Sequence, residues 1–331
     1  MRLWAITGLY IGGIIGAGFA SGQELTVFFV QYGRAGLFGI VLATLFLFLG
    51  TVLVLEFSAV RNVSSYTEIF ANLDPVLTTL LDLLYSLFLL IGISVMLAGT
   101  GAMGSTAMNS LFLRMATAGL VVWVLRKGVK GVLKTSGWLA PALVVILCGM
   151  ALHHLAKHGV QLPEQGSWRA LEAASLYGSY NVGFSMAVLA SVHQHLKTKG
   201  QRWALALSGS VVLGLCMVLL FLALSTLSTE QLRDPFPLVH LVENWGSLAY
   251  ATYQLMLWGA MYTTALAHAL ALVSRLTNWS GMTWSKASSL VIAATVGLSF
   301  FGFSTLVRIA YPILGLAGLW ILANLLRERV C

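Results

Sequence analysis

Long apolar runs separated by short polar stretches make up most of this chain. Ten of these runs come close to or exceed the roughly 20 apolar residues that a helix needs to cross a bilayer. They span about residues 3–31, 35–59, 75–100, 108–125, 132–153, 170–195, 203–227, 245–273, 287–303 and 305–326. The pattern predicts an all-α integral membrane protein with ten transmembrane helices and no separate soluble domain.

Composition agrees with this prediction, and the distribution of charge indicates an orientation. The chain is 58% hydrophobic and 9% charged, with a mean hydropathy of +0.87. Its net charge is +8, but most of its 19 Lys and Arg residues fall on one side once both termini are placed in the cytoplasm. Because this is the positive-inside pattern, we expect cytoplasmic termini, a bacterial-type inner membrane and no nucleic-acid partner.

The first apolar run contains a glycine-rich stretch in mid-membrane, Gly12-Gly-Ile-Ile-Gly-Ala-Gly18. Glycine weakens a helix by about 1 kcal/mol relative to alanine, and it lets a ligand approach the backbone closely. Lipid cannot satisfy free backbone groups, so non-helical backbone at this depth must line a cavity or lie inside protein. The stretch therefore predicts a broken helix at a solute or ion site. Close packing of small residues is the alternative.

The sixth run contains a second glycine-bearing stretch, residues 178–183. Its Gly183-Phe184 pair lies about half of the 331-residue chain away from Gly18-Phe19. Transporters are often built from inverted repeats with broken helices at corresponding positions. We therefore predict one transmembrane domain of two five-helix repeats in opposite orientation, residues 1–153 and 170–331, in which helices 1 and 6 are both broken.

The stretch Ile15-Gly-Ala-Gly-Phe-Ala-Ser-Gly-Gln-Glu24 resembles the first helix of the amino acid–polyamine–organocation superfamily, and within it the YkvI-type bacterial membrane proteins. The resemblance implies the LeuT fold with 5+5 inverted repeats. It also implies that the amides of Gly16, Ala17 and Gly18 face an anionic group of the substrate. Helix N-termini favour such groups because they present free N–H groups and a positive dipole end.

The resemblance further implies a sodium site between the first and eighth helices. The positions that correspond to the sodium ligands of relatives are the carbonyls of Gly12, Ile15 and Ala260 and the hydroxyls of Thr263 and Thr264. Adjacent threonines in membrane helices also bond to their own backbone. The motif by itself therefore leaves both interpretations open.

Charged residues within the spans are few, and each is a candidate functional group. Proton coupling through Lys134, Glu24 or Asp82 is the alternative to sodium, although Lys134 also fits a snorkelling residue and Asp82 a partner for a base on the cytoplasmic side. Ser21 and Glu24 have the spacing of a capping box. Glu24 and Arg308 are also placed to form an outer gate between the first and tenth helices.

Aromatic and polar residues near the expected breaks are candidates for contact with the substrate. We expect Tyr180, Asn181 and Phe184 from the sixth helix, with Tyr85 from the third, to line the site. Residues 228–244 fit either a helical cap over an outer vestibule or a plain loop.

Together these features predict a secondary active transporter for a small amino-acid-like or organic zwitterion or anion, driven by sodium through alternating access. The sequence has no phosphate-loop motif and no recognisable set of catalytic acids, nucleophile and base, or metal-binding residues. We therefore expect no enzymatic activity and no cofactor besides the sodium ion. A non-transporting solute receptor on the same fold is a further alternative. The expected partners are a small solute and the bilayer, with a homodimer left open.

Overall fold

The computed structural model describes residues 3–63, 65–71, 75–126, 139–163 and 166–330. In these residues the chain is helical, with an isolated β-bridge between Gly33 and Gly166 and no strand. Within them, 7 helices are long and apolar enough to cross a membrane. The chain is therefore an all-helical, multi-pass membrane protein, while the exact number of ten crossings remains a prediction.

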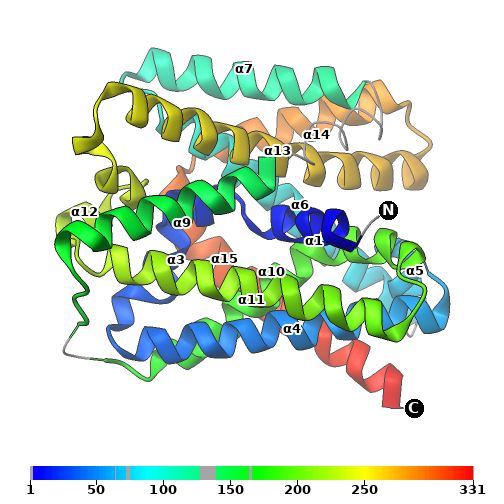
Figure 1. Cartoon of the computed structure of the whole chain (residues 1–331). Coiled ribbons are helices and arrows are strands. Elements are labelled where there is room, and N and C mark those ends of the chain that lie inside the picture. Colours follow the sequence, from blue (N-terminus) through cyan, green and yellow to red (C-terminus); the bar gives the residue numbers. More distant parts are fainter. Residues whose placement is uncertain (1–2, 64, 72–74, 127–138, 164–165, 331) are drawn as a thin grey trace.

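The long helices form two groups that lie on opposite sides of the molecule. The first group contains α4 (Ala35–Arg61), α10 (Arg169–Val192) and α11 (Lys199–Leu224), and α4 packs against both of the others. The second group contains α6 (Pro75–Ala102), α7 (Ala107–Leu125), α13 (Ser247–Ser280) and α14 (Trp284–Ser299), which also pack on one another. In Figure 1, α7, α13 and α14 lie at the top and α4 and α11 at the bottom.

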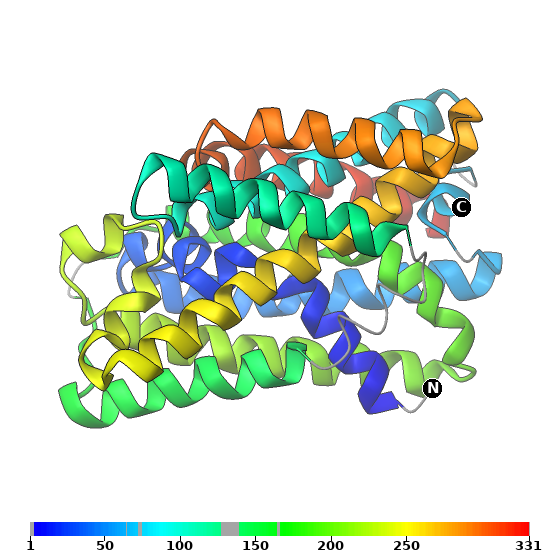
Figure 2. The same ribbon diagram turned by 90° about the horizontal axis from the view of Figure 1, so that it is seen from above.

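Helices α1 (Leu3–Ile14) and α15 (Phe303–Val330) lie between the two groups (Figure 1). Helix α15 packs against α10 on one side and α6 on the other, and α1 packs against α10 and α11. Helix α9 (Leu139–His158) packs against α11 and α1. The view from above shows both ends of the chain toward the same end of the long helices (Figure 2).

Short helices connect these elements. They are α2 (Ala17–Ser21), α3 (Gln23–Phe28), η1 (Val30–Tyr32), α5 (Tyr66–Ala71), η2 (His193–His195), α12 (Thr229–Arg233), η3 (Pro237–Leu241) and η4 (Glu243–Trp245). Between α11 and α13 the chain forms α12, η3 and η4, which corresponds to the helical one of the two alternatives for residues 228–244. Leu238 of η3 is fully buried, and its side chain leaves no room for a Cβ at Gly22. Tyr253 donates a hydrogen bond to the Ala20 carbonyl at 3.0 Å, so α13 also holds α2 in place.

Two ion pairs join helices at the predicted inner end of the molecule. Arg202 of α11 donates two hydrogen bonds to the Glu56 carboxylate of α4, both at 3.0 Å. Arg275 of α13 pairs with Asp82 of α6, with 2.7 Å between Nε and Oδ1. Each pair lies within one of the two groups. The Arg275 pair confirms that Asp82 is the partner of a base.

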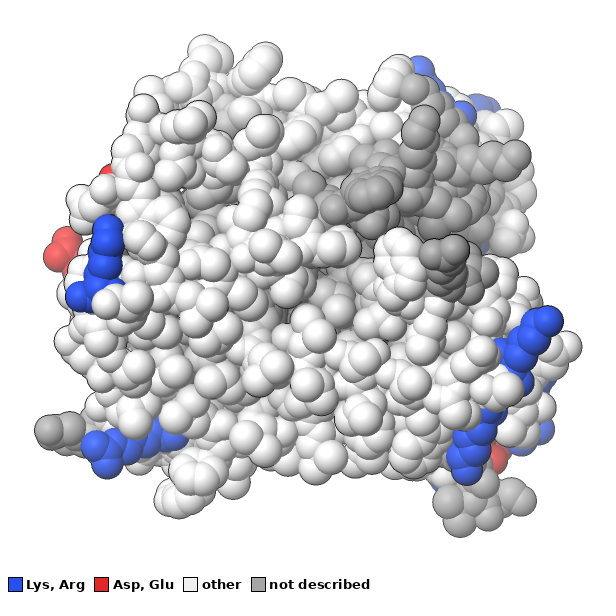
Figure 3. Space-filling model, viewed as in Figure 1, with Lys and Arg blue, Asp and Glu red and all other residues white. Residues whose placement is uncertain are grey.

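The surface agrees with a position in the bilayer. On the face seen in Figure 3, the Lys and Arg side chains lie toward the left and right edges, at the ends of the long helices, and a broad uncharged area separates them. Large apolar side chains such as Phe38 and Val41, which are 61% and 68% exposed, lie on the outside of α4. Lipid tails are the environment that such residues require.

Replacing Glu56 with glutamine should lower the free energy of unfolding by about 1–3 kcal/mol, because it removes the charge from two hydrogen bonds to a largely buried guanidinium. Thermal unfolding of the purified protein in detergent, followed by tryptophan fluorescence, measures the change. Glu172→Gln is the matched control, since Glu172 is an exposed carboxylate in the first turn of α10. Equal midpoints for the two variants would contradict the prediction.

Candidate functional site

The first predicted interruption lies at residues 15–16, between the end of α1 and the start of α2. In a continuous helix the Gly16 amide would donate to the Gly12 carbonyl, four residues earlier. Here it donates to the Ile14 carbonyl at 2.8 Å. Within the described backbone, no hydrogen bond ends on the carbonyl of Gly12 or Ile15. The interruption therefore releases the two first-helix carbonyls that were predicted to bind an ion.

The second predicted break is absent, because α10 continues without interruption from Arg169 to Val192. Its glycines have a packing role instead. A Cβ on Gly178 would overlap the side chain of Phe46, and a Cβ on Gly183 would lie 3.0 Å from the ring of Phe88. These glycines let α4 and α6 approach α10 closely, which is the ordinary use of small residues between membrane helices.

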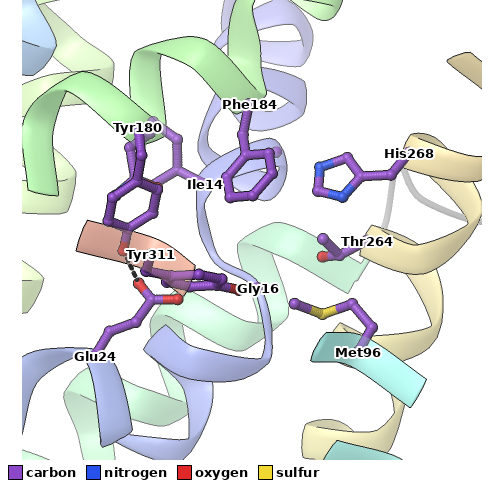
Figure 4. Close-up of a pocket in the computed structure, with 11 residues that line it drawn as sticks. Ile14, Gly16, Glu24, Met96, Tyr180, Phe184, Thr264, His268 and Tyr311 are labelled. Atoms are coloured by element: carbon purple, nitrogen blue, oxygen red, sulfur yellow. Dashed lines mark hydrogen bonds between the residues drawn. The ribbon is translucent and has the colours of Figure 1, made fainter. Parts of the chain in front are cut away.

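A small cavity lies beside the interruption, bordered by α10, α13 and α15 (Figure 4). Its lining residues are Gly13, Ile14, Gly16, Glu24, Met96, Tyr180, Asn181, Phe184, Thr264, His268 and Tyr311. The space open to a water-sized sphere is about 10 Å³, close to the minimum that one water molecule needs. In this conformation the cavity is therefore too small for a solute of amino-acid size.

The cavity brings together Gly16, Tyr180, Asn181, Phe184 and Thr264 from the predicted site residues. They come from three segments that are far apart in the sequence. The interruption, α10 and α13 meet here as the sequence analysis expected, even though α10 is not broken.

Tyr85 lies outside the cavity and belongs to an aromatic cluster nearer the predicted inner end. Its ring centroid is 4.4 Å from that of Tyr66 and 5.8 Å from that of Phe70. Its hydroxyl accepts a hydrogen bond from the Ala187 amide at 3.3 Å. The structure therefore places Tyr85 in the packing between α5, α6 and α10 rather than at the substrate site.

The two adjacent threonines of α13 differ in their hydrogen bonding. Thr263 lies 3.0 Å from the Gly259 carbonyl and 3.2 Å from the Ala260 carbonyl, and it donates back to its own helix. The Thr264 hydroxyl is buried and has no partner within the described part of the chain. It lies 3.6 Å from the position of a Cβ on Gly16. Thr264 therefore faces the interruption with a free oxygen.

Glu24 points back into the cavity instead of toward the surface (Figure 4). Its side chain is buried, and its carboxylate accepts a hydrogen bond from the Tyr180 hydroxyl at 2.8 Å. The carboxylate occupies the space directly above Gly18, where a Cβ would overlap it. Glu24 can adopt this position because Gly18 has no side chain.

The predicted capping box between Ser21 and Glu24 is wrong. Helix α3 begins after Gly22, which has a left-handed conformation with φ 84°. The Ser21 hydroxyl accepts a hydrogen bond from the Gln23 amide at 3.1 Å and donates to the Gly18 carbonyl. Because the tyrosine hydroxyl holds the carboxylate in the cavity, Glu24 is not available to its own backbone.

The structure does not bring the predicted gate residues together. Glu24 faces Tyr180, whereas Arg308 is exposed in the first turns of α15. Of the three candidates for proton coupling, Asp82 is paired with Arg275 and Lys134 lies outside the described residues. Glu24 lines the cavity.

Sequence reasoning did not assign Met96, His268 or Tyr311 to the site. The Tyr311 ring lies 4.9 Å from that of Tyr180, and the His268 ring stacks on Phe184 at 4.6 Å. Pro312 lies inside α15 next to Tyr311. A proline within a helix predicts a kink, so the sequence did mark this part of the helix as unusual. No comparable signal distinguishes Met96 from the many other apolar residues of α6.

Comparison with known proteins places the chain among LeuT-fold membrane proteins. No family model matches it. It is 26% identical to the Bacillus subtilis membrane protein YkvI over 329 residues, which cover 97% of this chain and 94% of YkvI. It is 27% identical to YyaD of the same species over 330 residues, which cover 96% of this chain and 94% of YyaD.

The solved structure of MhsT in complex with L-phenylalanine matches 99% of this chain and 91% of its own, with a TM-score of 0.73 and 16% identity. The chain is a homologue of YkvI and YyaD and has the LeuT fold. Mhp1, a nucleobase-cation-symport-1 family transporter with bromovinylhydantoin bound, matches this LeuT-fold chain with a TM-score of 0.61 and 15% identity. That match covers 96% of this chain and 77% of Mhp1.

The resemblance to YkvI-type proteins is therefore confirmed. At 15–16% identity, the likeness to solved structures shows the fold and not the substrate. YkvI is a membrane protein and Mhp1 is a transporter, in agreement with the expectation that this LeuT-fold chain is not an enzyme.

Replacing Gly18 with alanine should displace the Glu24 carboxylate from Tyr180 and lower the free energy of unfolding by about 1–3 kcal/mol, because a buried hydrogen bond to a charged group is lost. Thermal unfolding in detergent measures the loss. In the double variant Gly18→Ala/Glu24→Ala the two losses should not add, since both changes act on the same contact.

Gly13→Ala is the control for this experiment. Gly13 belongs to the same glycine-rich stretch, but a Cβ there would meet nothing within 4 Å, and alanine favours the helical conformation of α1. If Gly13→Ala and Gly18→Ala were equally destabilising, the damage would come from the segment as a whole and not from the contact with Glu24.

Proposed function

We propose that this chain is a secondary transporter that moves a small organic solute across the membrane by alternating access, coupled to sodium. The LeuT fold supports transport, because the matched Mhp1 structure is of a transporter. The position of the cavity supports it further, since LeuT-fold transporters hold their substrate and ions next to interrupted helices near the middle of the membrane. We place the ten crossings in a bacterial inner membrane, with both termini in the cytoplasm.

Packed side chains lie on either side of the cavity, an arrangement that is consistent with one state of an alternating-access cycle. On the predicted outer side, Leu238 of the cap packs against Gly22. On the predicted inner side, Tyr85 and its aromatic neighbours separate the cavity from the ends of α5 and α6. A solute larger than water would enter and leave only after one of these layers moves. Such layers are what a transporter needs to prevent free diffusion.

The single observation that carries the sodium proposal is the free hydroxyl of Thr264 opposite the interruption. Sodium in such folds is held by carbonyls of unwound backbone, and the Gly12 and Ile15 carbonyls have no backbone partner within the described residues. Thr264 adds an oxygen that is buried and unpaired. The residues present therefore fit a sodium ion. Thr263 fits less well, because its hydroxyl already bonds to its own helix.

The predicted binding of an anionic group at Gly16–Gly18 has less support. The Glu24 carboxylate covers Gly18, and a second negative group at the same place would be repelled by it. Asn181, His268 and the aromatic residues of the cavity offer polar and apolar contacts to a small solute. The solute is therefore proposed as a small organic molecule, without a requirement for a negative charge.

Sodium should stabilise the purified protein against heat relative to potassium, and Thr264→Ala should remove this stabilisation. A ligand that binds the folded state alone contributes RT ln(1 + [L]/Kd), about 2.7 kcal/mol at a hundredfold excess over Kd. Thr263→Ala is the matched control and should retain most of the sodium effect. Equal midpoints in sodium and potassium for the wild type would exclude sodium coupling.

Uptake into proteoliposomes separates a transporter from a solute receptor. Solutes that stabilise the protein are tested for accumulation under an inward sodium gradient and under a proton gradient. Accumulation with sodium, lost in Thr264→Ala, supports the proposed function. Binding without accumulation under either gradient would indicate a receptor, and accumulation with protons alone would indicate the alternative coupling ion.

A further inference from the structure

The cavity contains a buried carboxyl group, that of Glu24, with no cationic side chain beside it in the described part of the chain. Glu24 is 3% exposed, and its described contact with a polar group is the hydrogen bond from Tyr180. Among the residues that the structure describes, no Lys or Arg lines the cavity. The arginines that form ion pairs between the described helices, Arg202 and Arg275, are paired with other carboxylates. A buried carboxylate without compensation costs several kcal/mol, and this cost is removed either by a proton or by a bound cation.

The position of this carboxylate is built into the fold. Gly18 leaves the space that the carboxylate fills, and α10 supplies the Tyr180 hydroxyl that holds one of its oxygens. The other oxygen points to the interior of the cavity, beside the ring of Tyr311 (Figure 4). One oxygen is therefore held by the protein, and the other remains available to a ligand.

Aromatic rings surround the same space. The ring centroid of Tyr311 lies 4.9 Å from Tyr180 and 5.9 Å from Phe184, and Tyr180 and Phe184 are 5.8 Å apart. The faces of aromatic rings attract organic cations, especially where water is excluded. A carboxylate in a cavity lined by three aromatic rings suits a positively charged amine better than an anion.

We propose that the transported solute carries an ammonium group, primary or methylated, that binds to Glu24 between the rings of Tyr180, Tyr311 and Phe184. This inference rests on the proposed transport function and names the chemical class of its solute. Glu24 provides the counter-ion, the three rings provide cation–π contacts, and the Tyr180 hydroxyl orients the carboxylate. The solute's ammonium group then supplies the missing positive charge of the cavity.

The test compares ligands of similar shape and different charge. The purified protein is unfolded thermally in potassium buffer at neutral pH with butylamine, butan-1-ol or butyrate, and with choline as a methylated ammonium. Butylamine or choline should raise the unfolding midpoint in a saturable manner, whereas butan-1-ol and butyrate should not. Equal effects of the alcohol or the acid, or no effect of either ammonium compound, would overturn the proposal.

The decisive variant is Glu24→Gln, which keeps an acceptor for the Tyr180 hydroxyl and removes the charge. The affinity for the ammonium compound should fall about 10- to 100-fold, as expected for the loss of a charge-assisted hydrogen bond. Tyr180→Phe should weaken binding less, because the carboxylate remains. Glu172→Gln removes an exposed carboxylate from the same helix as Tyr180 and should bind like the wild type. Ammonium affinity that is unchanged in Glu24→Gln would contradict the proposal.

Three outcomes separate this inference from the proposed function. Sodium-driven uptake of a neutral or anionic solute that is unaffected by Glu24→Gln would overturn the inference and leave the transport function intact. Ammonium binding that depends on Glu24, without uptake under any gradient, would support the inference and overturn transport. If Glu24→Gln keeps ammonium binding but abolishes the pH dependence of uptake, Glu24 carries a proton and the inference is wrong.

Discussion

The architecture around the cavity depends on one constraint, which is that hydrocarbon offers no partner to a free backbone carbonyl. The turn at residues 15–16 releases the carbonyls of Gly12 and Ile15 in the first membrane segment. Such a turn is tolerated where protein encloses it, and here α10, α11 and α13 do so. Two of these shielding helices, α10 and α13, also carry side chains of the site. Helices α10 and α13 therefore both shield the interrupted backbone from lipid and contribute side chains to the cavity.

The glycine pattern predicted part of this arrangement and misled in another part. Near Gly16 the glycines accompany a real break. At Gly178 and Gly183 the same residue type allows Phe46 and Phe88 to pack closely against an unbroken helix. Local sequence cannot separate these uses of glycine, because the difference lies in residues from α4 and α6 that are distant along the chain. The Glu24 position shows the same limit, since its choice of Tyr180 over its own backbone depends on a contact across 156 residues.

The two helix groups have their own internal connections. Arg202 and Glu56 join α11 to α4, and Arg275 and Asp82 join α13 to α6. Within the described residues, no ion pair connects one group to the other. The groups are joined instead by α1, α2 and α15, and by direct aromatic contacts of Phe184 in α10 with Phe88 in α6 and His268 in α13. This division suits a rocking motion of rigid bodies about a central site, because such a motion would not have to break a buried ion pair.

The contact of the Glu24 carboxylate with Gly18 has an evolutionary consequence. The two positions lie six residues apart, and neither can change freely while the other is kept, because any side chain at position 18 occupies the volume of the carboxylate. Substitutions at the two sites should therefore be epistatic. Among homologues, glycine at position 18 should accompany a long acidic residue at position 24, and a larger residue at 18 should accompany its loss. The two positions would then co-vary, and homologues that lack the pair would be expected to bind a ligand of different charge.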